Sequence, residues 1–363
     1  MRLGIDARLL TQTGVGVYTY NLLYYLPQYL PKDWKVFVFV RSEDRSQVPH
    51  SDRYNIVKAD YRWHTIAEQT GFLVQLISYK LDLMHFTYFS YPLLYKDPFV
   101  STIHDLTPVL FKTGKASTKS GLEYYPKYFA MTRVIEQSIK NSRAIITPTE
   151  FVKRQVLKLY SAAEEKIFVT PEGLNLKLIT ATENRLLGKQ FTKPFLLYVG
   201  NFYPHKNVDK LIEAYANIKS DCQLVLVGPE DHFSGKMRDL IKSLDRGNRI
   251  VMYHNASLSD LVFFYKHANA LVHPSLSEGY GLTPMEALYF NTPVIASNIE
   301  VFKETLGDSY TAFNPNSVSD IQETIEQVLR DTPKVDASIL LGNKSFKTMA
   351  KETVAVYKRA LGM

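Results

Sequence analysis

Short runs of Val, Ile, Leu and Phe alternate with longer amphipathic stretches along this chain, and a second series of this alternation begins near its middle. Continuous apolar runs of this kind are typical of strands buried on both faces of a parallel sheet, with the amphipathic stretches as crossover helices. Because the alternation occurs in two separate series, we expect two doubly wound α/β domains. A length of 363 residues is also too great for one ordinary core and suits two.

The boundaries of the expected elements follow from the same pattern. Strands are predicted near residues 2–7, 35–40, 54–58, 82–86, 98–103 and 143–147, then near 195–199, 222–227, 249–252, 269–273 and 292–296. Helices are predicted near residues 15–29, 65–80, 120–141 and 150–160, then near 207–219, 234–244, 258–268, 283–290 and 317–330. A polar, patternless stretch separates the two series. We therefore expect a first domain over 1–173, a linker over 174–192 and a second domain over 193–342.

Composition narrows the class of protein. The chain has one cysteine, Cys222, which excludes an internal disulfide framework and a zinc site built from cysteines, and which favours a reducing compartment. The first residues, MRLGIDARLL, enter a strand-like run at once, which leaves no room for a signal peptide. No apolar stretch reaches the length of about 18 residues that a membrane span needs. We expect a cytoplasmic protein.

Positive charge is concentrated in residues 101–160, where ten Lys and Arg residues face four acids, a net charge of +6. One interpretation is a set of solvated helix faces. The other is attraction to an anionic partner such as a lipid headgroup layer, with the protein peripheral to the inner face of the membrane. Nucleic acid is not expected, because no zinc pattern, helix-turn-helix signal or aromatic RNA-binding motif accompanies the charge.

In doubly wound sheets ligands bind at the carboxyl ends of the strands, so functional residues are expected in the turns that leave the strands. The first is LLTQTGVGVYTYNLL, in which Gly14 and Gly16 lie between a strand and a helix. Glycines here would let the backbone approach a ligand and let helix N–H groups face an anion. A plain tight turn is the alternative, and the dinucleotide fingerprint fails because Thr19 occupies its third glycine position.

The second turn, FVSTIHDLTPV, ends a strand in His104 and Asp105. A histidine at this place could hydrogen-bond a substrate hydroxyl or exchange a proton near neutral pH. A structural histidine with satisfied hydrogen bonds is the alternative.

The third turn, LLYVGNFYPHKNVDKLIEAY, places Lys206 just before a helix for which we predict Asn207 as the N-cap. A cation beside the positive end of a helix dipole is unfavourable unless an anion is also present. This favours a phosphate site over a solvated lysine.

The fourth turn, PSLSEGYGLTPMEAL, holds two carboxylates, Glu278 and Glu286. Thr283, Pro284 and Glu286 have the form of a capping box, with Thr283 as N-cap and Pro284 at the first helical position. That explanation leaves Glu278 without a role. Alternatively, the two carboxylates bind hydroxyls of a sugar and a ribose, while free helix amides hold the phosphates between them.

Together these motifs resemble those of a known family. GIDARLLTQTGVGVYTYNLL, STIHDLTPV, IITPTEFVKRQV, YVGNFYPHKN and HPSLSEGYGLTPMEALYFNTPVIAS are similar, in the same order, to the motifs of the retaining, sugar-nucleotide-dependent glycosyltransferases of family 4. The match covers nearly the whole chain, and its E-x7-E spacing is highly specific. The resemblance implies the GT-B architecture of two facing Rossmann-like domains. It further implies an acceptor-binding first half, a donor-binding second half and a final helix, near 343–361, that crosses back onto the first domain.

The same resemblance implies roles for individual residues of the second half. Lys206 matches the lysine that neutralises the donor diphosphate, Glu286 the glutamate that holds the ribose hydroxyls, and Glu278 the acid that contacts the transferred sugar. The other donor-binding positions expected on this basis are Asn201, Gly281, Leu282 and Thr283.

In the first half, Gly14 and Gly16 match the loop that closes over the diphosphate, and His104 the histidine that contacts the donor sugar. Two positions depart from the family pattern. Asn201 stands where many members have an arginine that acts as a second phosphate cation, so stabilisation of the leaving group rests on Lys206 and helix N-termini. Glu172 stands where asparagine is usual, and the sequence assigns it no role.

We therefore expect a hexosyltransferase that uses GDP-mannose or a UDP-hexose to extend a glycan or a lipid-linked acceptor, as in polysaccharide biosynthesis. Retention of configuration is implied by the family, and the mechanism needs no metal or other cofactor. Two alternatives stay open. One is a sugar-nucleotide epimerase or hydrolase of the same architecture. The other is a non-catalytic partner subunit, suggested by the missing arginine.

Overall fold

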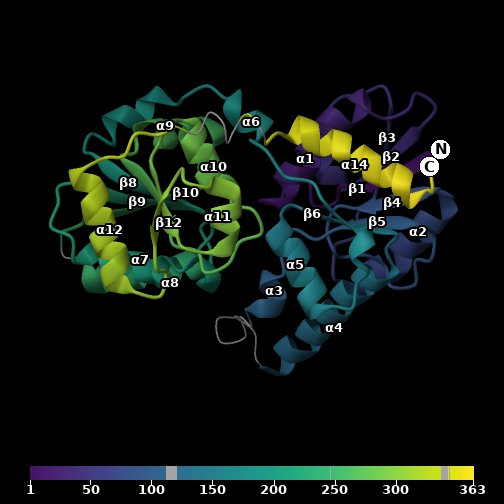
Figure 1. Ribbon diagram of the computed structural model, residues 1–363, viewed down its shortest axis with the longest axis horizontal. Coiled ribbons are helices and arrows are strands. Elements are labelled where there is room, and N and C mark those ends of the chain that lie inside the picture. Colours follow the sequence, from purple (N-terminus) through teal and green to yellow (C-terminus); the bar gives the residue numbers. More distant parts are fainter. Residues whose placement is uncertain (112–120, 246, 337–341, 343) are drawn as a thin grey trace. The chain divides into compact units, whose positions relative to one another are not determined.

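The computed structural model describes residues 1–111, 121–245, 247–336, 342 and 344–363 (Figure 1). The chain divides into two compact units, one made of Met1–Gly173 and Lys344–Met363 and the other of Leu174–Asn343. Each unit has its own parallel sheet. The prediction of two doubly wound α/β domains is therefore confirmed.

The first unit has, in its described part, a seven-stranded parallel sheet of order β3-β2-β1-β4-β5-β6-β7. Its strands are β1 (Arg2–Asp6), β2 (Lys35–Val40), β3 (Tyr54–Lys58), β4 (Leu83–Phe86), β5 (Phe99–Thr102), β6 (Ala144–Thr147) and β7 (Ile167–Val169). β2 reads KVFVFV, and four of its six side chains are buried, as expected for a strand covered on both faces. One buried cluster packs around Phe39 and Phe86 and another around Ile145 and Val152.

The helices of this unit include the connections between its parallel strands and one helix from the end of the chain. They are α1 (Val15–Tyr25), α2 (Leu73–Ser78), α3 (Thr107–Leu110), α4 (Gly121–Asn141), α5 (Glu150–Leu159) and α14 (Phe346–Ala360), and a π-helical segment, η3 (Glu68–Phe72), precedes α2. Lys112, Lys115 and Lys119, three of the cations in the basic window, lie outside the described residues.

The second unit has, among its described residues, a six-stranded parallel sheet of order β10-β9-β8-β11-β12-β13. Its strands are β8 (Phe195–Val199), β9 (Gln223–Gly228), β10 (Ile250–His254), β11 (Ala270–His273), β12 (Val294–Ser297) and β13 (Thr311–Phe313). Its helices include α6 (Leu176–Ile179), α7 (Val208–Ala216), α8 (His232–Leu244), α9 (Leu258–His267), α10 (Leu282–Tyr289), α11 (Glu300–Leu306) and α12 (Val318–Arg330). The strand order reverses direction between β8 and β11, which makes the loops after these two strands the expected ligand position.

Residues 174–192 are not the patternless linker that the sequence predicts. They contain α6 and a 3-10 helix, η6 (Arg185–Lys189), both of which pack against α9 in the second unit. Asn184 caps η6 and donates from Nδ2 to Asp260 at 2.7 Å. A segment without hydrophobic periodicity is therefore held by capping and side-chain hydrogen bonds.

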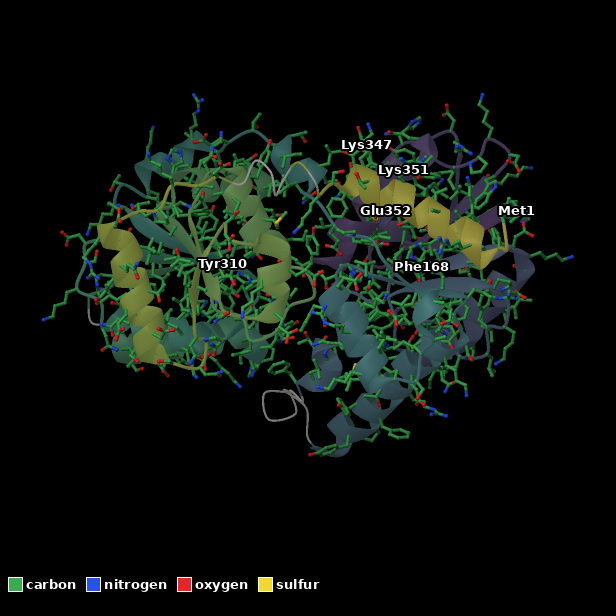
Figure 2. The ribbon with its side chains drawn as sticks, in the orientation of Figure 1. Met1, Phe168, Tyr310, Lys347, Lys351 and Glu352 are labelled. Carbon is green, nitrogen blue, oxygen red and sulfur yellow. The ribbon has the colours of Figure 1, made fainter. Side chains whose placement is uncertain are left out.

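The last helix, α14, belongs to the first unit, where it packs against α1 (Figure 1). Tyr357 of α14 is buried, and its hydroxyl lies 2.7 Å from Nδ1 of His85 in β4. Phe168 of β7, labelled in Figure 2, lies beneath the Arg359 guanidinium of α14, 5.4 Å from ring centroid to carbon. On the outer side of the helix, Lys347 and Lys351 are exposed. The predicted return of the final helix onto the first domain is confirmed.

Candidate functional site

Two loops at the centre of the second sheet bring a lysine and a glutamate together. Lys206 follows β8 and Glu278 follows β11, its neighbour in the sheet. The Lys206 ammonium donates to Glu278 Oε1 at 2.6 Å, and both side chains are largely buried. Leu276 N–H also donates to the His205 carbonyl at 2.7 Å, so the backbones of the two loops are tied to each other.

Glu278 Oε1 accepts two further hydrogen bonds. His273 Nε2 donates at 2.8 Å and Ser275 Oγ at 2.7 Å. Burial by itself would raise the pKa of Glu278, but the Lys206 charge and the His273 hydrogen bond outweigh burial and hold the pKa well below its usual range. Glu278 is therefore an ionised carboxylate whose position is fixed from three sides.

His273 is a site residue that the sequence analysis missed. It ends β11, is buried, and stacks on the ring of Tyr198 at 6.1 Å and 20°. Its Nδ1 has no hydrogen-bond partner in the described part of the chain. Burial lowers the pKa of His273, only partly opposed by the bond to Glu278, so the imidazole is neutral at pH 7. The signal that singled out His104, a histidine at the end of a buried strand, was present here too.

The protein itself supplies an anion for Lys206. A cation beside a helix N-terminus needs an anion, and Glu278 supplies one in this structure. Asn207 occupies the predicted N-cap position of α7, but its side chain does not cap the helix. Its backbone is left-handed with φ 57°, whereas a capping residue is ordinarily extended, and its side chain makes no cap hydrogen bond. Its amide instead donates to the carbonyls of Pro274 and Pro315 at 3.2 and 2.8 Å, which fixes three loops together.

The predicted capping box after Glu278 is also wrong. α10 begins at Leu282, one residue before Thr283, and Gly281 with φ +91° turns the chain into the helix without a side-chain cap. A Cβ at Gly281 would lie 2.7 Å from the Phe302 ring, so this turn requires glycine. Pro284 is the third helical residue, where its missing N–H has no intrahelical partner to lose. The amides of α10 therefore start immediately after the Glu278 loop.

The Glu286 side chain does not cap its own helix. It is buried, and it accepts a hydrogen bond from the Tyr265 hydroxyl of α9 at 2.9 Å. Burial raises the pKa of Glu286 to about 7 despite this hydrogen bond. The group thus changes charge close to physiological pH, and a ligand hydroxyl that donated to it would favour the ionised form.

Asn201 lies in the loop between β8 and Lys206. Its Oδ1 accepts from the Tyr203 N–H at 3.4 Å, and its carbonyl accepts from the buried Tyr198 hydroxyl at 2.5 Å. Tyr198 in turn stacks on His273. Asn201 is consequently connected to the loop around Glu278 through Tyr198.

In the first unit, His104 follows β5 and both of its ring nitrogens face oxygen atoms. Nε2 donates to the Thr87 carbonyl at 2.9 Å, and Nδ1 lies 3.2 Å from Glu172 Oε1. Tyr18 of α1 contacts the ring edge to face at 4.7 Å. Glu172, to which the sequence assigned no role, is therefore the carboxylate partner of His104.

Gly14 and Gly16 lie at the start of α1 and meet different surroundings. Gly14 has φ +70°, and a Cβ there would meet nothing within 4 Å. A Cβ at Gly16 would lie 2.5 Å from the Leu10 carbonyl oxygen. The tight turn accounts for Gly16, whereas Gly14 combines a left-handed backbone with open space. The structure places these glycines and His104 in the first unit, and Lys206, Glu278 and Glu286 in the second.

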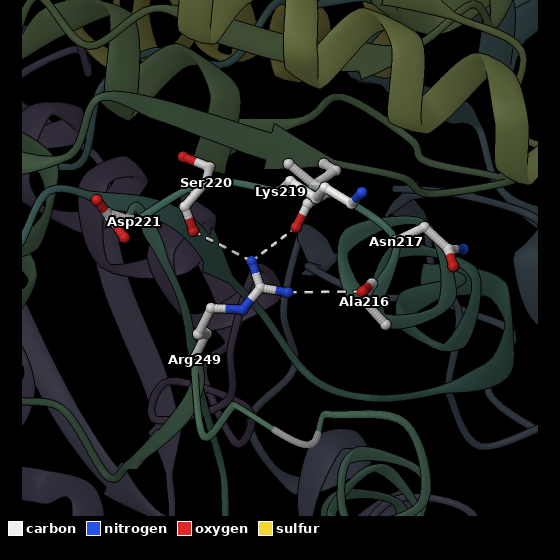
Figure 3. Close-up of a pocket in the computed structure, with 7 residues that line it drawn as sticks. Ala216, Asn217, Lys219, Ser220, Asp221 and Arg249 are labelled. Carbon is white, nitrogen blue, oxygen red and sulfur yellow. Dashed lines mark hydrogen bonds between the residues drawn. The ribbon is translucent and has the colours of Figure 1, made fainter.

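A surface hollow of the second unit lies elsewhere (Figure 3). It measures about 660 Å³ and is lined by Arg249 and by the segment that leads from α7 to β9. The Arg249 guanidinium donates to the carbonyls of Ile218 and Ser220 at 2.7 and 3.2 Å and lies over the Tyr215 ring at 5.1 Å. The hollow is thus at the amino edge of the sheet, opposite Lys206 and Glu278, and Arg249 there satisfies carbonyls of the segment that follows α7.

Within the described residues, no three His, Cys, Asp or Glu side chains are grouped so that they could hold a metal ion. In the same residues no helix is both long and apolar enough to cross a bilayer.

Comparison with known proteins places the chain in a family. Residues 12–178 match the model described as Glycosyltransferase Family 4, and residues 180–339 match the model described as Glycosyl transferases group 1. Among curated proteins, the O-antigen chain mannosyltransferase RfbU of Salmonella typhimurium is 27% identical over 62% of this chain. The match spans 60% of the length of RfbU. An uncharacterised glycosyltransferase of Methanocaldococcus jannaschii is 24% identical over 96% of this chain and 86% of its own length.

Solved structures show the same fold. A sucrose-phosphate synthase from Thermosynechococcus elongatus superposes with a TM-score of 0.72 at 19% identity, over 99% of this chain and 96% of that one. HepE of Anabaena, solved in complex with UDP and glucose, superposes with a TM-score of 0.74 at 14% identity over 99% of both chains. The two family models together span nearly the whole chain, as the motifs do. This protein belongs to glycosyltransferase family 4 and has the GT-B fold.

Proposed function

We propose that the chain is a retaining hexosyltransferase that takes its sugar from a nucleotide-diphosphate donor. The observation that carries this proposal is the Lys206–Glu278 pair at the switch point of the second sheet, directly before the amino end of α10. A cation and free helix amides suit a diphosphate, and an ionised carboxylate beside them suits the hydroxyls of a sugar. No metal is part of the proposal, because Lys206 and the amides supply the positive charge.

In the reaction, the bond from C1 of the sugar to the donor diphosphate breaks with oxocarbenium character. Lys206 and the first amides of α10 stabilise the charge that develops on the leaving oxygen. The acceptor hydroxyl attacks C1 from the face that the diphosphate leaves, and its proton passes to the departing diphosphate oxygen. Glu278 holds the transferred sugar through its hydroxyls, and Glu286 in its ionised form accepts from the ribose hydroxyls.

For the sugar we favour mannose or glucose, carried as GDP-mannose or a UDP-hexose. The mannosyltransferases RfbU of Salmonella typhimurium and WbdA of Escherichia coli are among the relatives, and the latter is 27% identical over 64% of this chain. The match spans 29% of WbdA, so the function of that whole protein is not transferred. HepE, which shares the fold, binds UDP-glucose. We propose a glycan or lipid-linked acceptor in polysaccharide biosynthesis.

The test is a melting-temperature screen of the purified chain against GDP-, UDP-, ADP- and dTDP-sugars, followed by a transfer assay with the donor that binds. A ligand that binds only the native state raises the melting temperature by mass action. Transfer to an added acceptor supports the proposal. Altered or free sugar from donor alone would identify an epimerase or hydrolase instead. Donor binding without any turnover would identify a non-catalytic subunit.

We also propose that the first unit contacts an anionic membrane surface, at the inner face of the membrane. On α4, Tyr125 and Phe129 lie one turn apart and are exposed to about 70%. Lys140 near the end of α4 and Lys158 near the end of α5 are exposed too. Exposed aromatic side chains beside lysines suit an interface of acyl chains and anionic headgroups.

Flotation with vesicles tests this second proposal. The chain should float with phosphatidylglycerol vesicles and remain behind with phosphatidylcholine vesicles, and added salt should weaken the binding. The variants Phe129→Ser and Lys158→Glu should bind less, whereas Lys242→Glu, at an exposed position of α8, should bind as the unsubstituted chain does. Binding that is absent or indifferent to salt contradicts the proposal.

A further inference from the structure

Glu278 has more donors than its ion pair requires. Lys206, His273 and Ser275 all donate to Oε1, at 2.6, 2.8 and 2.7 Å. Of these donors only Lys206 is charged, because the buried His273 is neutral at pH 7. The Glu278 carboxylate is thus held by one cation and two neutral donors. An anionic ligand can attract the cation, but it does not attract the neutral donors.

The neutral donors are rigidly mounted. His273 ends β11, pairs in register with Ala296 of β12 and stacks on Tyr198, while Ser275 is fully buried two residues later. The Ser275 hydroxyl lies 3.1 Å from His273 Nε2 as well as 2.7 Å from Glu278, so the three groups form a closed cluster. Lys206, in contrast, carries its ammonium on a flexible four-carbon chain.

The surroundings of Nδ1 determine which tautomer the His273 imidazole adopts. Nδ1 is buried and has no partner among the described residues, whereas Nε2 faces a carboxylate. A proton on Nδ1 would leave a buried donor unsatisfied, at a cost of about 1–3 kcal/mol. The proton therefore resides on Nε2, where it forms a charge-assisted bond to Glu278.

From this geometry we infer that His273 and Ser275 are positioning residues that hold Glu278 in place when the donor diphosphate draws Lys206 away. The Lys206–Glu278 ion pair is then broken when the donor binds. Lys206 exchanges the carboxylate for phosphate oxygens, and Glu278, still anchored through Oε1, presents its remaining acceptor capacity to the sugar. This inference rests on the proposed function, in which an anionic donor binds at Lys206.

Its test separates anchoring from phosphate binding. His273→Ala removes a neutral donor, His273→Gln restores an N–H near the position of Nε2, and Ser275→Ala removes the other donor. His273→Ala should bind inorganic pyrophosphate as the unsubstituted chain does but transfer hexose about 10- to 100-fold more slowly, since small misplacements cost this much. His273→Gln should recover most of the rate. Lys206→Met should lose pyrophosphate binding. His232→Gln, at the exposed start of α8, is the matched control.

Nuclear magnetic resonance of the imidazole nitrogens provides a readout that does not depend on turnover. In the full chain with labelled histidine, the His273 signals, assigned by their loss in His273→Gln, should show the neutral Nε2–H form at pH 7 with and without pyrophosphate. An imidazolium or an Nδ1–H form overturns the inference, as does full activity in His273→Ala or failure of His273→Gln to recover the rate.

If the unsubstituted chain transfers no hexose, the proposed function fails, and the tautomer together with pyrophosphate binding still decides the inference. If His273→Ala does not fold, Ser275→Ala takes its place in both assays.

Discussion

The Lys206 ammonium and the Glu278 carboxylate meet at 2.6 Å, although 72 residues separate them in the chain. They meet because β8 and β11 are neighbours at the centre of the second sheet and both loops leave its carboxyl edge. Each charge is partly buried, so each depends on the other in the ligand-free protein. A ligand that binds Lys206 has to break the existing ion pair with Glu278. Donor binding is therefore coupled to the stability of this part of the second unit.

Substituting either member of this pair should abolish sugar transfer and also weaken the fold. Lys206→Met leaves Glu278 with two neutral donors, and Glu278→Gln leaves a partly buried ammonium without its counter-ion. We expect each to lower the free energy of unfolding by about 2 kcal/mol, after allowance for the residual exposure of both groups. The measurement is urea unfolding together with initial transfer rates.

The double variant gives the control. Because neither charge then lacks a partner, its loss of stability should be smaller than the sum of the two single losses. Additive losses would mean that the two residues do not interact. Transfer activity in either single variant would contradict the assignment of these residues to the donor site.

The same pair shows which features of the site could be predicted from the sequence. The charged residues stand in turns after buried strands, and the topology of a doubly wound sheet predicts that such turns converge. The contact between Lys206 and Glu278 depends on atomic distances, which the hydrophobic pattern of a sequence does not specify. The same holds for the hydrogen bonds that His273 and Ser275 donate to Glu278. Glu278, which local rules left without a role, is the residue on which these tertiary contacts converge.

Glu286 should make stability depend on pH in a defined direction. Its pKa rises on folding from an ordinary value near 4.5 to about 7. Between these values the unfolded chain ionises while the native protein keeps the proton, so this contribution to stability is present below pH 4.5 and lost as pH rises through 7. Glu286→Gln should therefore gain stability relative to the unsubstituted chain between pH 5 and 8, by up to about 3 kcal/mol.

Urea unfolding at pH 5 and pH 8 measures this difference. Glu278→Gln is the matched control, because the pKa of Glu278 is lowered on folding and its titration lies below this window. Its stability difference from the unsubstituted chain should stay constant from pH 5 to 8. A constant difference for Glu286→Gln as well would show that Glu286 is ionised throughout.

Glu172 should matter for the rate through His104. Its carboxylate lies 3.2 Å from Nδ1 of His104, and the opposite ring nitrogen is held by the Thr87 carbonyl. Glu172→Gln keeps the size of the side chain but replaces the carboxylate that faces Nδ1 of His104. We expect the transfer rate to fall on the order of tenfold, because the imidazole loses its fixed orientation.

Initial rates at saturating donor test this expectation. Glu164→Gln is the control, since Glu164 is an exposed partner of Lys153 in the same unit. Equal rates for Glu172→Gln and the unsubstituted chain would show that Glu172 serves the fold alone.

The two glycines before α1 should differ in their tolerance of a methyl group. Gly16→Ala would place Cβ 2.5 Å from a backbone oxygen of Leu10, and the turn would have to shift, at a cost of about 1–3 kcal/mol. Gly14→Ala meets no neighbour and has only the strain of its φ of +70°, about 1 kcal/mol. Urea unfolding of both variants should rank Gly16→Ala as the less stable. The reverse order would contradict the close approach at Gly16.

The failed predictions have a common physical origin. Asn207 and Thr283 are good capping residues by local preference, and the side chain of neither caps a helix here. Asn207 is held in a left-handed backbone by carbonyls 67 and 108 residues away, and α10 starts at Leu282 because Gly281 makes the turn. Tertiary hydrogen bonds and a glycine turn thus override capping preference. The strands β7 and β13 were missed for a simpler reason, since three residues show no periodicity.

His85 should make the first unit sensitive to acid. Its Nδ1 lies 2.7 Å from the Tyr357 hydroxyl of α14 and its Nε2 lies 2.8 Å from Thr102 Oγ1, all buried. Burial lowers the pKa of His85 to about 3. Above pH 6.5 the group is neutral in both states. As pH falls from 6.5 to 3 the unfolded chain gains a proton that the native protein does not, and stability declines by up to about 1.4 kcal/mol per pH unit.

Melting temperatures at pH 7.5 and pH 5 test this coupling. His85→Gln removes the titrating group, so its melting temperature should fall less than that of the unsubstituted chain between the two pH values. Tyr357→Phe keeps His85 but leaves a ring nitrogen without its partner, and we expect a loss of about 1–3 kcal/mol already at pH 7.5. Because Tyr357 lies on α14, that loss would measure how firmly the C-terminal helix holds the first unit. An unchanged melting temperature in Tyr357→Phe would mean that this contact contributes nothing to the attachment of α14.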